Sequence, residues 1–376
     1  MRVLMTGGGT GGHVNPALAI ARTIKQNDEN AVIAYVGTER GIENKLVGRV
    51  GYPMYHVEVK GIKRSLSPSN IKAAYLALTS PHKAKKIIRE FSPDIVIGTG
   101  GYVCWPVVKA AADMGIPTAL HESNAIAGVA VKMLVGHVDR IWLNFEKTAE
   151  SINRKYESKL LHVGNPVSSG FRSVSKEEAR EKLGIAGKYE KMILSYGGSM
   201  GAEKVNDAAL EVMKRYSSRH PETLHVHATG SIEHEICTGL FKEAGLDGYP
   251  NIELLEFIYD MPLRMAAADL VICRAGAMTV SELAMSRSCA IFIPSPNVAE
   301  NHQYKNAKVL EDAGAAFLFE ERDLAEKPEL LTDTVEALLS DEGADDMRSM
   351  REKISAFATP DANKLIYEDI LKLLKK

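Results

Sequence analysis

Short apolar runs alternate with longer amphipathic stretches along almost the whole chain. Runs of this kind are typical of strands buried on both faces, and the stretches between them have helical spacing. Two successive series predict an α/β protein with two parallel sheets, each covered by helices on both faces. The predicted strands are residues 3–5, 32–36, 95–97, 118–120, 141–143 and 160–163 in the first half, and 192–196, 224–227, 252–255, 270–273, 290–293 and 316–319 in the second.

The two series meet at a turn sequence, Gly-Asn-Pro at residues 164–166. Glycine and proline together are strong breakers of regular structure. We therefore expect one domain over residues 1–164 and a second over 165–355. Residues 362–374 have apolar positions along one helical face, so we expect the segment 356–376 to pack back on the first domain.

The most informative stretch is residues 273–282, Cys-Arg-Ala-Gly-Ala-Met-Thr-Val-Ser-Glu. It follows a predicted strand, and a helix is expected to begin at Thr279 or Ser281. This places backbone N–H groups and the positive end of a helix dipole where open α/β sheets bind ligands. N–H groups suit a phosphate and Glu282 can accept hydrogen bonds from sugar hydroxyls, so a nucleotide sugar is favoured. The alternative is a strand–helix corner capped by Ser281.

A glycine-rich loop at residues 7–12 follows the first predicted strand. Gly7, Gly9 and Gly12 fit the G-x-G-x-x-G pattern, and Glu39 follows the second strand, so a dinucleotide fold is an alternative. His13 comes directly after the glycines. An imidazole at a phosphate-binding helix start can act as a base or a donor, and the alternative is a structural histidine.

Similar loops follow other predicted strands in both halves. In the first half they are residues 98–102 and 121–124, where Glu122 and Asn124 can bond a sugar. In the second half they are residues 197–201, an anion-binding glycine turn, 257–262 around Ile258, and 301–303, where Gln303 is a candidate for hydroxyl contacts. Their shared position at strand ends is what favours a binding site.

Composition is that of an ordinary water-soluble enzyme. The 376 residues favour two domains, with 45% hydrophobic and 25% charged residues and a net charge of −2. No apolar run approaches the roughly 20 residues of a membrane span, and residues 2–5 already have strand character, so we expect no signal peptide. Four widely spaced cysteines indicate buried thiols in a reducing compartment, and no ligand cluster predicts a metal or another cofactor.

Residues 59–89 form a basic segment with eight lysines and arginines and no acid. Within it Ile71, Tyr75 and Leu78 share one helical face. A basic, partly apolar surface suits an anionic membrane, whereas the alternative is a solvated helix packed on the sheet. Aromatic residues make up only 6% and no nucleic-acid motif occurs, so we expect no nucleic-acid partner.

Six motifs in order, over nearly the whole chain, resemble glycosyltransferase family 28, in particular its peptidoglycan-synthesis enzymes, which add N-acetylglucosamine to a lipid-linked muramyl-pentapeptide. The motifs are residues 8–13, 100–102, 121–124, 164–166, 197–199 and 274–282. The resemblance implies a GT-B fold, with two Rossmann-like domains facing across a cleft. It also implies an inverting transfer without a metal or other cofactor, and an enzyme bound peripherally to the cytoplasmic face of the plasma membrane.

The resemblance also implies roles for particular residues. The donor, UDP-N-acetylglucosamine, would be held mainly by the second domain, with Glu282 on the ribose. His13 would be the catalytic base with Glu122 as its orienting partner, and Gly100 and Gly101 would lie near the acceptor pyrophosphate. The remaining donor contacts would come from Ser199, Ile258, Ala277, Met278, Thr279, Val280, Ser281 and Gln303, joined by Thr10, Gly11, Gly12 and Asn124.

Two departures from the family pattern concern Ser168, and Asn15 with Trp105, which occupy positions where relatives often differ. Some relatives carry arginine after the Gly-Asn-Pro-Val run, where this chain has Ser168, so an arginine contact to the donor is not carried over. The interpretations from other classes are an oxidoreductase that uses the first glycine loop with Glu39, and a sugar-nucleotide-binding module without catalysis.

Overall fold

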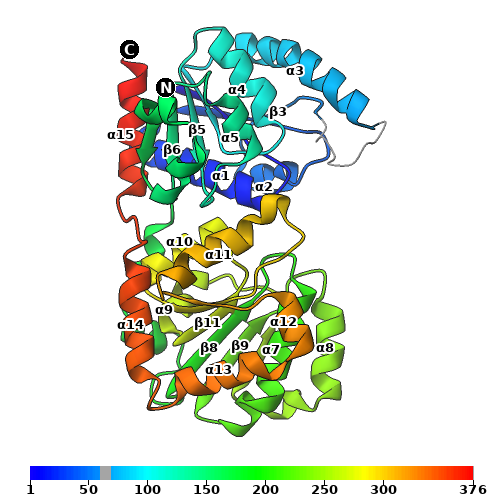
Figure 1. The fold of residues 1–376 in the computed structure, drawn as a ribbon, viewed down its shortest axis with the longest axis vertical. Coiled ribbons are helices and arrows are strands. Elements are labelled where there is room, and N and C mark those ends of the chain that lie inside the picture. The colour runs from blue at the N-terminus through cyan, green and yellow to red at the C-terminus, as the bar shows by residue number, and fades with distance from the viewer. Residues whose placement is uncertain (60–68, 376) are drawn as a thin grey trace. The chain divides into compact units, whose positions relative to one another are not determined.

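A computed structural model describes residues 1–59 and 69–375, without the side chains of residues 69–75, 77, 78 and 299. Cα packing divides the chain into two compact units. Unit 1 is Met1–Val167 with Thr359–Lys376, and unit 2 is Ser168–Ala358. Each unit is an α/β body around one parallel sheet (Figure 1), which confirms the predicted fold class.

The sheet of unit 1 has the strand order β3-β2-β1-β4-β5-β6-β7. Its strands are β1 (Arg2–Thr6), β2 (Val32–Gly37), β3 (Met54–His56), β4 (Ile95–Gly98), β5 (Thr118–Glu122), β6 (Arg140–Leu143) and β7 (Leu160–His162). Its helices are α1 (Gly11–Asn27), α2 (Glu43–Val50), α3 (Ser69–Phe91), α4 (Cys104–Asp113), α5 (Val129–Leu134), the 3-10 turns η1 (Glu146–Ser151) and η2 (Arg154–Lys159), and α15 (Ala362–Leu374).

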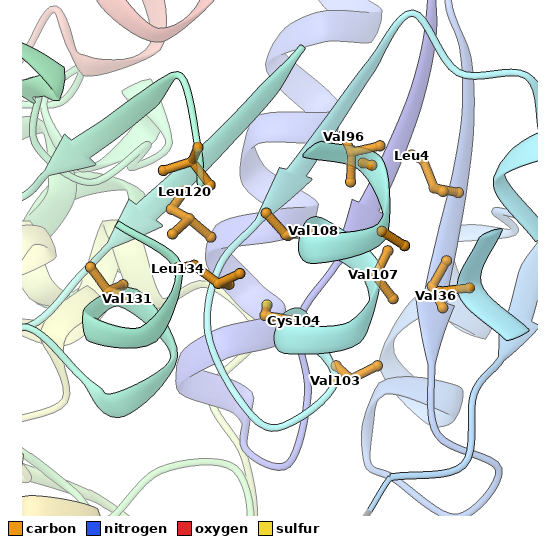
Figure 2. Close-up of a cluster of buried hydrophobic side chains, with 14 of the residues drawn as sticks. Leu4, Val36, Val96, Val103, Cys104, Val107, Val108, Leu120, Val131 and Leu134 are labelled. Atoms are coloured by element: carbon orange, nitrogen blue, oxygen red, sulfur yellow. The ribbon is translucent and has the colours of Figure 1, made fainter. Parts of the chain in front are cut away.

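Each face of this sheet has its own apolar core. On one face, side chains of α4 and α5 meet side chains of the sheet in a cluster that includes Leu4, Val107, Leu120 and Leu134 (Figure 2). On the other face, α1 and the C-terminal α15 pack together on the strands. Because both faces are covered, the strands read as continuous apolar runs in the sequence.

The C-terminal helix α15 is fixed to unit 1 by a buried polar contact as well. The Asp369 carboxylate accepts hydrogen bonds from Trp142 Nε1 at 2.8 Å and from Arg140 Nε at 2.9 Å. Trp142 is fully buried, and the pairing of Asp369 with arginine offsets the cost of burying its charge.

The sheet of unit 2 has the order β10-β9-β8-β11-β12-β13. Its strands are β8 (Lys191–Tyr196), β9 (Thr223–Ala228), β10 (Ile252–Leu255), β11 (Leu270–Cys273), β12 (Cys289–Phe292) and β13 (Phe317–Leu318). Its helices are α6 (Lys176–Lys182), α7 (Glu203–Arg215), α8 (His234–Glu243), α9 (Met261–Ala267), α10 (Ala277–Ser286), α11 (His302–Asp312), α12 (Glu321–Glu326), α13 (Glu329–Leu339) and α14 (Ala344–Ser355), with 3-10 turns η3 (Ser169–Phe171), η4 (Ser217–Arg219), η5 (Leu246–Gly248) and η6 (Ala299–Asn301).

Strand order reverses once in each sheet, between β1 and β4 in unit 1 and between β8 and β11 in unit 2. Loops at the carboxyl ends of such neighbouring strands diverge, which leaves a place for ligands. The glycine loops after β1, β4 and β8 and the turn after β11 all lie at these two points. The topology therefore brings the motifs of each half to one sheet edge.

Three local predictions were wrong. The short edge strand β3 was not predicted, because three residues next to a proline carry too little pattern. His121 and Glu122 belong to β5 itself instead of the loop after it. Helix α10 begins at Ala277, before the expected Thr279 or Ser281, because Gly276 already takes the extended N-cap conformation.

Within the described residues no helix has the length and apolar character that a bilayer crossing requires.

Candidate active site

The two glycine loops of unit 1, residues 7–12 and 98–102, are joined by a backbone hydrogen bond. The Gly8 N–H donates to the Gly100 carbonyl at 3.2 Å. Gly101 has a φ of +85°, and a Cβ there would collide with the Gly8 backbone, so only glycine fits. The Thr99 hydroxyl, in the second loop, donates to the His13 carbonyl at 2.6 Å. The contacts hold the start of α1 against the end of β4.

His13 lies where these loops meet, in the first turn of α1. Its Nδ1 is 3.0 Å from the Gly8 carbonyl oxygen and 3.3 Å from the Thr10 hydroxyl. Because a carbonyl only accepts, Nδ1 carries the proton of the neutral ring and Nε2 is left as an acceptor. Burial lowers the pKa of His13 below its ordinary value, against a smaller opposing effect of the Gly8 carbonyl. The ring is therefore a neutral base near pH 7.

Gly100 makes room for that ring. A Cβ on Gly100 would lie 2.5 Å from His13 Cδ2, and the backbone has a φ of +110°. Beside it, Gly11 and Gly12 occupy the first two positions of α1, where backbone N–H groups have no partner within the helix. Thr10, the N-cap residue, makes no capping hydrogen bond through its side chain. The site thus combines N–H donors for an anion with a base.

Glu122 holds the loop that follows β5. Its Oε1 accepts from the Asn124 backbone at 2.9 Å and from the Asn124 side-chain amide at 3.0 Å, and its Oε2 accepts from Gly128 N at 2.7 Å. These bonds order the loop and fix the Asn124 side chain. The neighbouring His121 is buried, which lowers its pKa to about 4, and it bonds the Gly164 carbonyl. The roles of Glu122 as an orienting residue and of Asn124 in donor binding stay predictions.

A buried carboxylate that the sequence analysis missed braces the first glycine loop. Glu43, at the start of α2, accepts from Thr38 N at 2.8 Å, Thr38 Oγ1 at 2.7 Å and Gly9 N at 3.3 Å. Burial raises its pKa, but these hydrogen bonds prevail and hold the pKa below its ordinary value. Glu39, the predicted ribose acid of the dinucleotide alternative, is instead exposed. An acid opening an amphipathic helix looks solvated in sequence, so no signal marked Glu43.

In unit 2 the turn after β8 meets the turn after β9. The Ser199 carbonyl accepts from Ser231 N at 3.3 Å, while the Ser199 side chain is exposed at the carboxyl end of the sheet. Ser199 is followed by exposed Met200, and α7 begins at Glu203. The exposed hydroxyl thus lies in a glycine turn of the kind that can bind a phosphate.

The start of α10 supplies the second group of donors in unit 2. Met278 and Thr279 occupy its second and third positions, where backbone N–H groups have no partner in the helix. Ala277 and Val280 are buried, and the Ser281 hydroxyl donates to the Ala277 carbonyl at 3.2 Å, so Ser281 does not cap the helix. The side chains of these three residues support the helix, and their assignment to substrate binding stays a prediction.

Glu282 is the chemically distinctive group of this helix. Among the described residues its carboxyl receives no hydrogen bond, and burial raises its pKa to about 8. Its charge also raises the pKa of Tyr196 and Cys273, at the ends of β8 and β11, although their own burial is the larger cause. A carboxyl without partners at the sheet edge is costly to keep, which favours a ligand that supplies hydroxyl donors.

Gln303 and Ile258 complete the predicted set. Gln303 Oε1 accepts from Ser295 N at 2.9 Å, which leaves its NH₂ group to donate. Ile258 is buried, between Phe257 and Tyr259, whose rings meet edge to face at 4.9 Å. Tyr259 is 91% exposed, so an aromatic ring next to the predicted donor contact Ile258 faces solvent. Sequence analysis singled out Ile258 and missed the two aromatic neighbours.

No described part of the chain brings together three or more histidine, cysteine or acidic side chains in a way that could hold a metal ion. All four cysteines are buried and free of disulfides. Burial raises the pKa of Cys104 and of Cys273 to about 12, so neither is a nucleophile at neutral pH.

Comparison with known proteins gives one family over most of the chain. The model of the glycosyltransferase family 28 N-terminal domain matches residues 3–143, and that of the C-terminal domain matches residues 192–366. A relative from Acetivibrio thermocellus is 41% identical over 375 residues, covering 100% of this chain and 99% of the relative. A second, from Listeria monocytogenes, is 40% identical and covers both chains completely, at 100%. Both are named UDP-N-acetylglucosamine–N-acetylmuramyl-(pentapeptide) pyrophosphoryl-undecaprenol N-acetylglucosamine transferase.

Solved structures agree with the family models. The crystal structure of MurG from Acinetobacter baumannii has a TM-score of 0.76 and 29% identity, covering 99% of each chain. A UDP-GlcNAc 2-epimerase from Neisseria meningitidis, bound to UDP-GlcNAc, has a TM-score of 0.63 at 15% identity and shows likeness of fold alone. With both family models matched in order along one chain and full-length relatives near 40% identity, this protein belongs to glycosyltransferase family 28.

Proposed function

We propose that the protein transfers N-acetylglucosamine from UDP-N-acetylglucosamine to the lipid-linked N-acetylmuramyl-pentapeptide, with inversion at the anomeric carbon. The observation that carries this proposal is the full-length likeness to relatives named for that transfer. The residues of the two sheet edges fit the chemistry. Unit 2 offers the groups that a nucleotide sugar needs, and unit 1 offers a base next to N–H donors.

Unit 2 binds the donor in this proposal. The Glu282 carboxyl takes the ribose hydroxyls, which give it the hydrogen bonds that the described residues do not supply. The N–H groups of Met278 and Thr279 and the turn around Ser199 take the pyrophosphate at a positive helix end. The amide NH₂ of Gln303 donates to a sugar hydroxyl.

The transfer forms one bond, breaks another and moves one proton. The acceptor 4-hydroxyl oxygen forms a bond to C1 of N-acetylglucosamine while the bond from C1 to the phosphate oxygen breaks. UDP leaves with the bonding electrons, and backbone N–H groups stabilise the charge that develops on its phosphate. The hydroxyl proton passes to Nε2 of His13, the ring nitrogen that the Gly8 contact leaves unprotonated.

The acceptor's lipid places the reaction at a membrane surface. The basic part of α3, with exposed Lys86 and Arg89, gives unit 1 a surface for anionic headgroups. The predicted apolar face, Ile71, Tyr75 and Leu78, lies outside the described side chains. We propose a peripheral enzyme on the cytoplasmic face, where UDP-sugars are available.

A turnover assay tests the proposal directly. The purified protein is mixed with radiolabelled UDP-N-acetylglucosamine and a lipid-linked muramyl-pentapeptide, and we expect label in the lipid product and release of UDP. Titration with NAD(P) is the control for the oxidoreductase alternative, and we expect no binding. Donor binding without transfer would support the alternative of a sugar-nucleotide-binding module. The absence of both donor binding and transfer would refute the proposed transferase.

A further inference from the structure

A cavity of about 590 Å³ lies in unit 1 beside the first glycine loop. This volume is in the range of ordinary ligand sites, roughly 300–1,000 Å³. The walls come from the first glycine loop, the loop after β2, the segment after β3, one side chain of α3 and the start of α4. Neither the donor contacts nor the base described above uses this space.

Two neighbouring side chains of α2 fix the cavity wall. Glu43 bonds Thr38 and Gly9, which ties the loop after β2 to the glycine loop. Asn44 Nδ2 donates to the carbonyls of Thr38 at 2.7 Å and Gly41 at 3.0 Å. The wall is therefore preformed, so a ligand does not have to order it on binding.

Asn44 also sets the state of a histidine in the cavity. Because its amide nitrogen donates to two carbonyls, its Oδ1 accepts from His56 Nε2 at 2.7 Å. The neutral His56 ring then carries its proton on Nε2, and Nδ1 is an acceptor for an N–H group.

Charges of both signs line the rest of the cavity. Arg40 and Lys83 are cations, and Glu39 and Glu58 are anions, with Lys83 Nζ 3.8 Å from Glu58 Oε2. Because two cations and two carboxylates balance in this lining, a pyrophosphate gains little net attraction there. A peptide, with a carboxylate at its end and N–H and carbonyl groups along it, offers partners to both signs. The exposed ring of Tyr102 adds an apolar surface.

We propose that this cavity binds the peptide of the acceptor, with a peptide carboxylate on Arg40 and a peptide N–H on His56. The inference rests on the proposed function and names the subsite for one part of its acceptor. The cavity includes Gly8, whose carbonyl holds the His13 ring, so a peptide bound there keeps the acceptor next to the base.

Two acceptors and three variants test this subsite. The acceptors are the lipid-linked muramyl-pentapeptide and the same molecule without its peptide. Arg40→Ala and His56→Phe each remove one proposed peptide contact, and His56→Phe also removes the hydrogen bond to Asn44. Both residues are exposed, so folding should be retained. Arg49→Ala, an exposed arginine of α2 outside the cavity lining, is the matched control.

For the pentapeptide acceptor we expect KM to rise about 10- to 100-fold in Arg40→Ala, the range for one hydrogen bond to a charged group, with a smaller rise in His56→Phe and kcat little changed. For the acceptor without peptide, wild type should already show the raised KM, and neither variant should change it further. Equal losses on both acceptors would overturn the proposal and assign the cavity to the pyrophosphate or the sugar, and unchanged KM on both would also overturn it. A wild type that turns over neither acceptor would instead refute the proposed function itself.

Discussion

At the scale of single residues, Glu282 stands out because its burial favours the neutral carboxyl and lowers the stability of the folded chain once the group would otherwise ionise. Burial raises its pKa from 4.5 to about 8, so the folded chain resists ionisation that the unfolded chain undergoes freely. The folded state therefore loses stability as pH rises from about 4.5 to 8, and each pKa unit corresponds to about 1.4 kcal/mol as an upper limit. If Glu282 binds the donor as proposed, this cost is an exchange of stability for function.

Glu282→Gln should remove this loss. Its Tm should equal that of wild type near pH 5 and exceed it near pH 9, because glutamine does not ionise. Donor affinity should fall about 10- to 100-fold, and its rise between pH 6 and 8 in wild type, from ionisation of the carboxyl, should disappear. Scanning calorimetry and donor titration measure both, with Glu235→Gln on the exposed part of α8 as control. A Tm difference that does not vary with pH would contradict the burial argument.

In the proposed mechanism His13 accepts the proton on Nε2, because its Nδ1 bonds the Gly8 carbonyl. His13→Ala should lower kcat about 10²- to 10⁴-fold and leave the KM for the donor nearly unchanged. Because burial holds the pKa of His13 below the ordinary histidine value of 6.5, kcat in wild type should fall only at a pH below that ordinary value. Initial rates over pH 5–9 at saturating substrates measure both effects. Near-normal kcat in His13→Ala would move the base to another group, with Glu122 the first to test.

Sequence reasoning singled out residues that follow glycine runs and missed residues that support those loops through hydrogen bonds. Histidine after a glycine loop and a lone acid in a small-residue helix are visible as patterns. Glu43 and Asn44 act through bonds to the Thr38 backbone, and no local pattern reveals which loop a side chain will reach. The partner of a buried polar group depends on tertiary packing.

At the scale of elements, a buried polar network joins β8, β9 and α7. The Ser195 hydroxyl bonds His225 Nε2 at 2.9 Å and His227 Nδ1 at 2.8 Å, and His227 Nε2 bonds Asn206 at 3.1 Å. Burial lowers the pKa of His225 to about 3 and of His227 to about 4. Both rings are neutral in the folded chain, whereas they charge below about pH 6.5 when unfolded.

Unit 2 should therefore lose stability as pH falls from about 6.5 toward 4, because the unfolded chain binds more protons there. Urea midpoints at pH 7.5 and 5 measure the loss, which should be smaller in His225→Gln than in wild type. His82→Gln, an exposed histidine of α3, is the control and should behave as wild type. An equal loss in all three proteins would mean that other groups cause the acid sensitivity.

Strands were predictable where burial on both faces of the sheet requires a continuous apolar run, as in β1, β8 and β11. The first and last residues of the elements were harder to predict. The helix α10 starts two residues before the first predicted position because Gly276 adopts the N-cap conformation, and glycine has little preference of its own. The edge strand β3 owes its existence to pairing with β2, which the local sequence does not contain.

At the scale of the whole molecule, the two-sheet class followed from the alternation alone, while the function required six motifs in order. The pairing of α15 with unit 1 joins residues such as Trp142 and Asp369 that are far apart in sequence. An amphipathic pattern shows that a helix must pack, and only the fold shows where.

The basic part of α3 is the region of unit 1 that we expect at the membrane. Lys85, Lys86 and Arg89 lie on a helix near the cavity of the further inference, while Lys83 lines that cavity and is left unchanged. Each well-placed cation contributes about 1 kcal/mol to binding an anionic surface. Replacing the three residues with Glu should therefore weaken binding to anionic vesicles strongly.

Vesicle sedimentation with phosphatidylglycerol measures this binding, which should also weaken with salt because exposed charges are screened over about 8 Å at physiological ionic strength. The matched control replaces three exposed lysines of unit 2, Lys182, Lys188 and Lys242, with Glu and should bind as wild type. Turnover of the long lipid acceptor in vesicles should fall with binding. Turnover of a short, water-soluble acceptor should not, since it needs no surface. Equal vesicle binding by wild type and the α3 variant would leave this helix as a solvated face and place the membrane contact elsewhere on the chain.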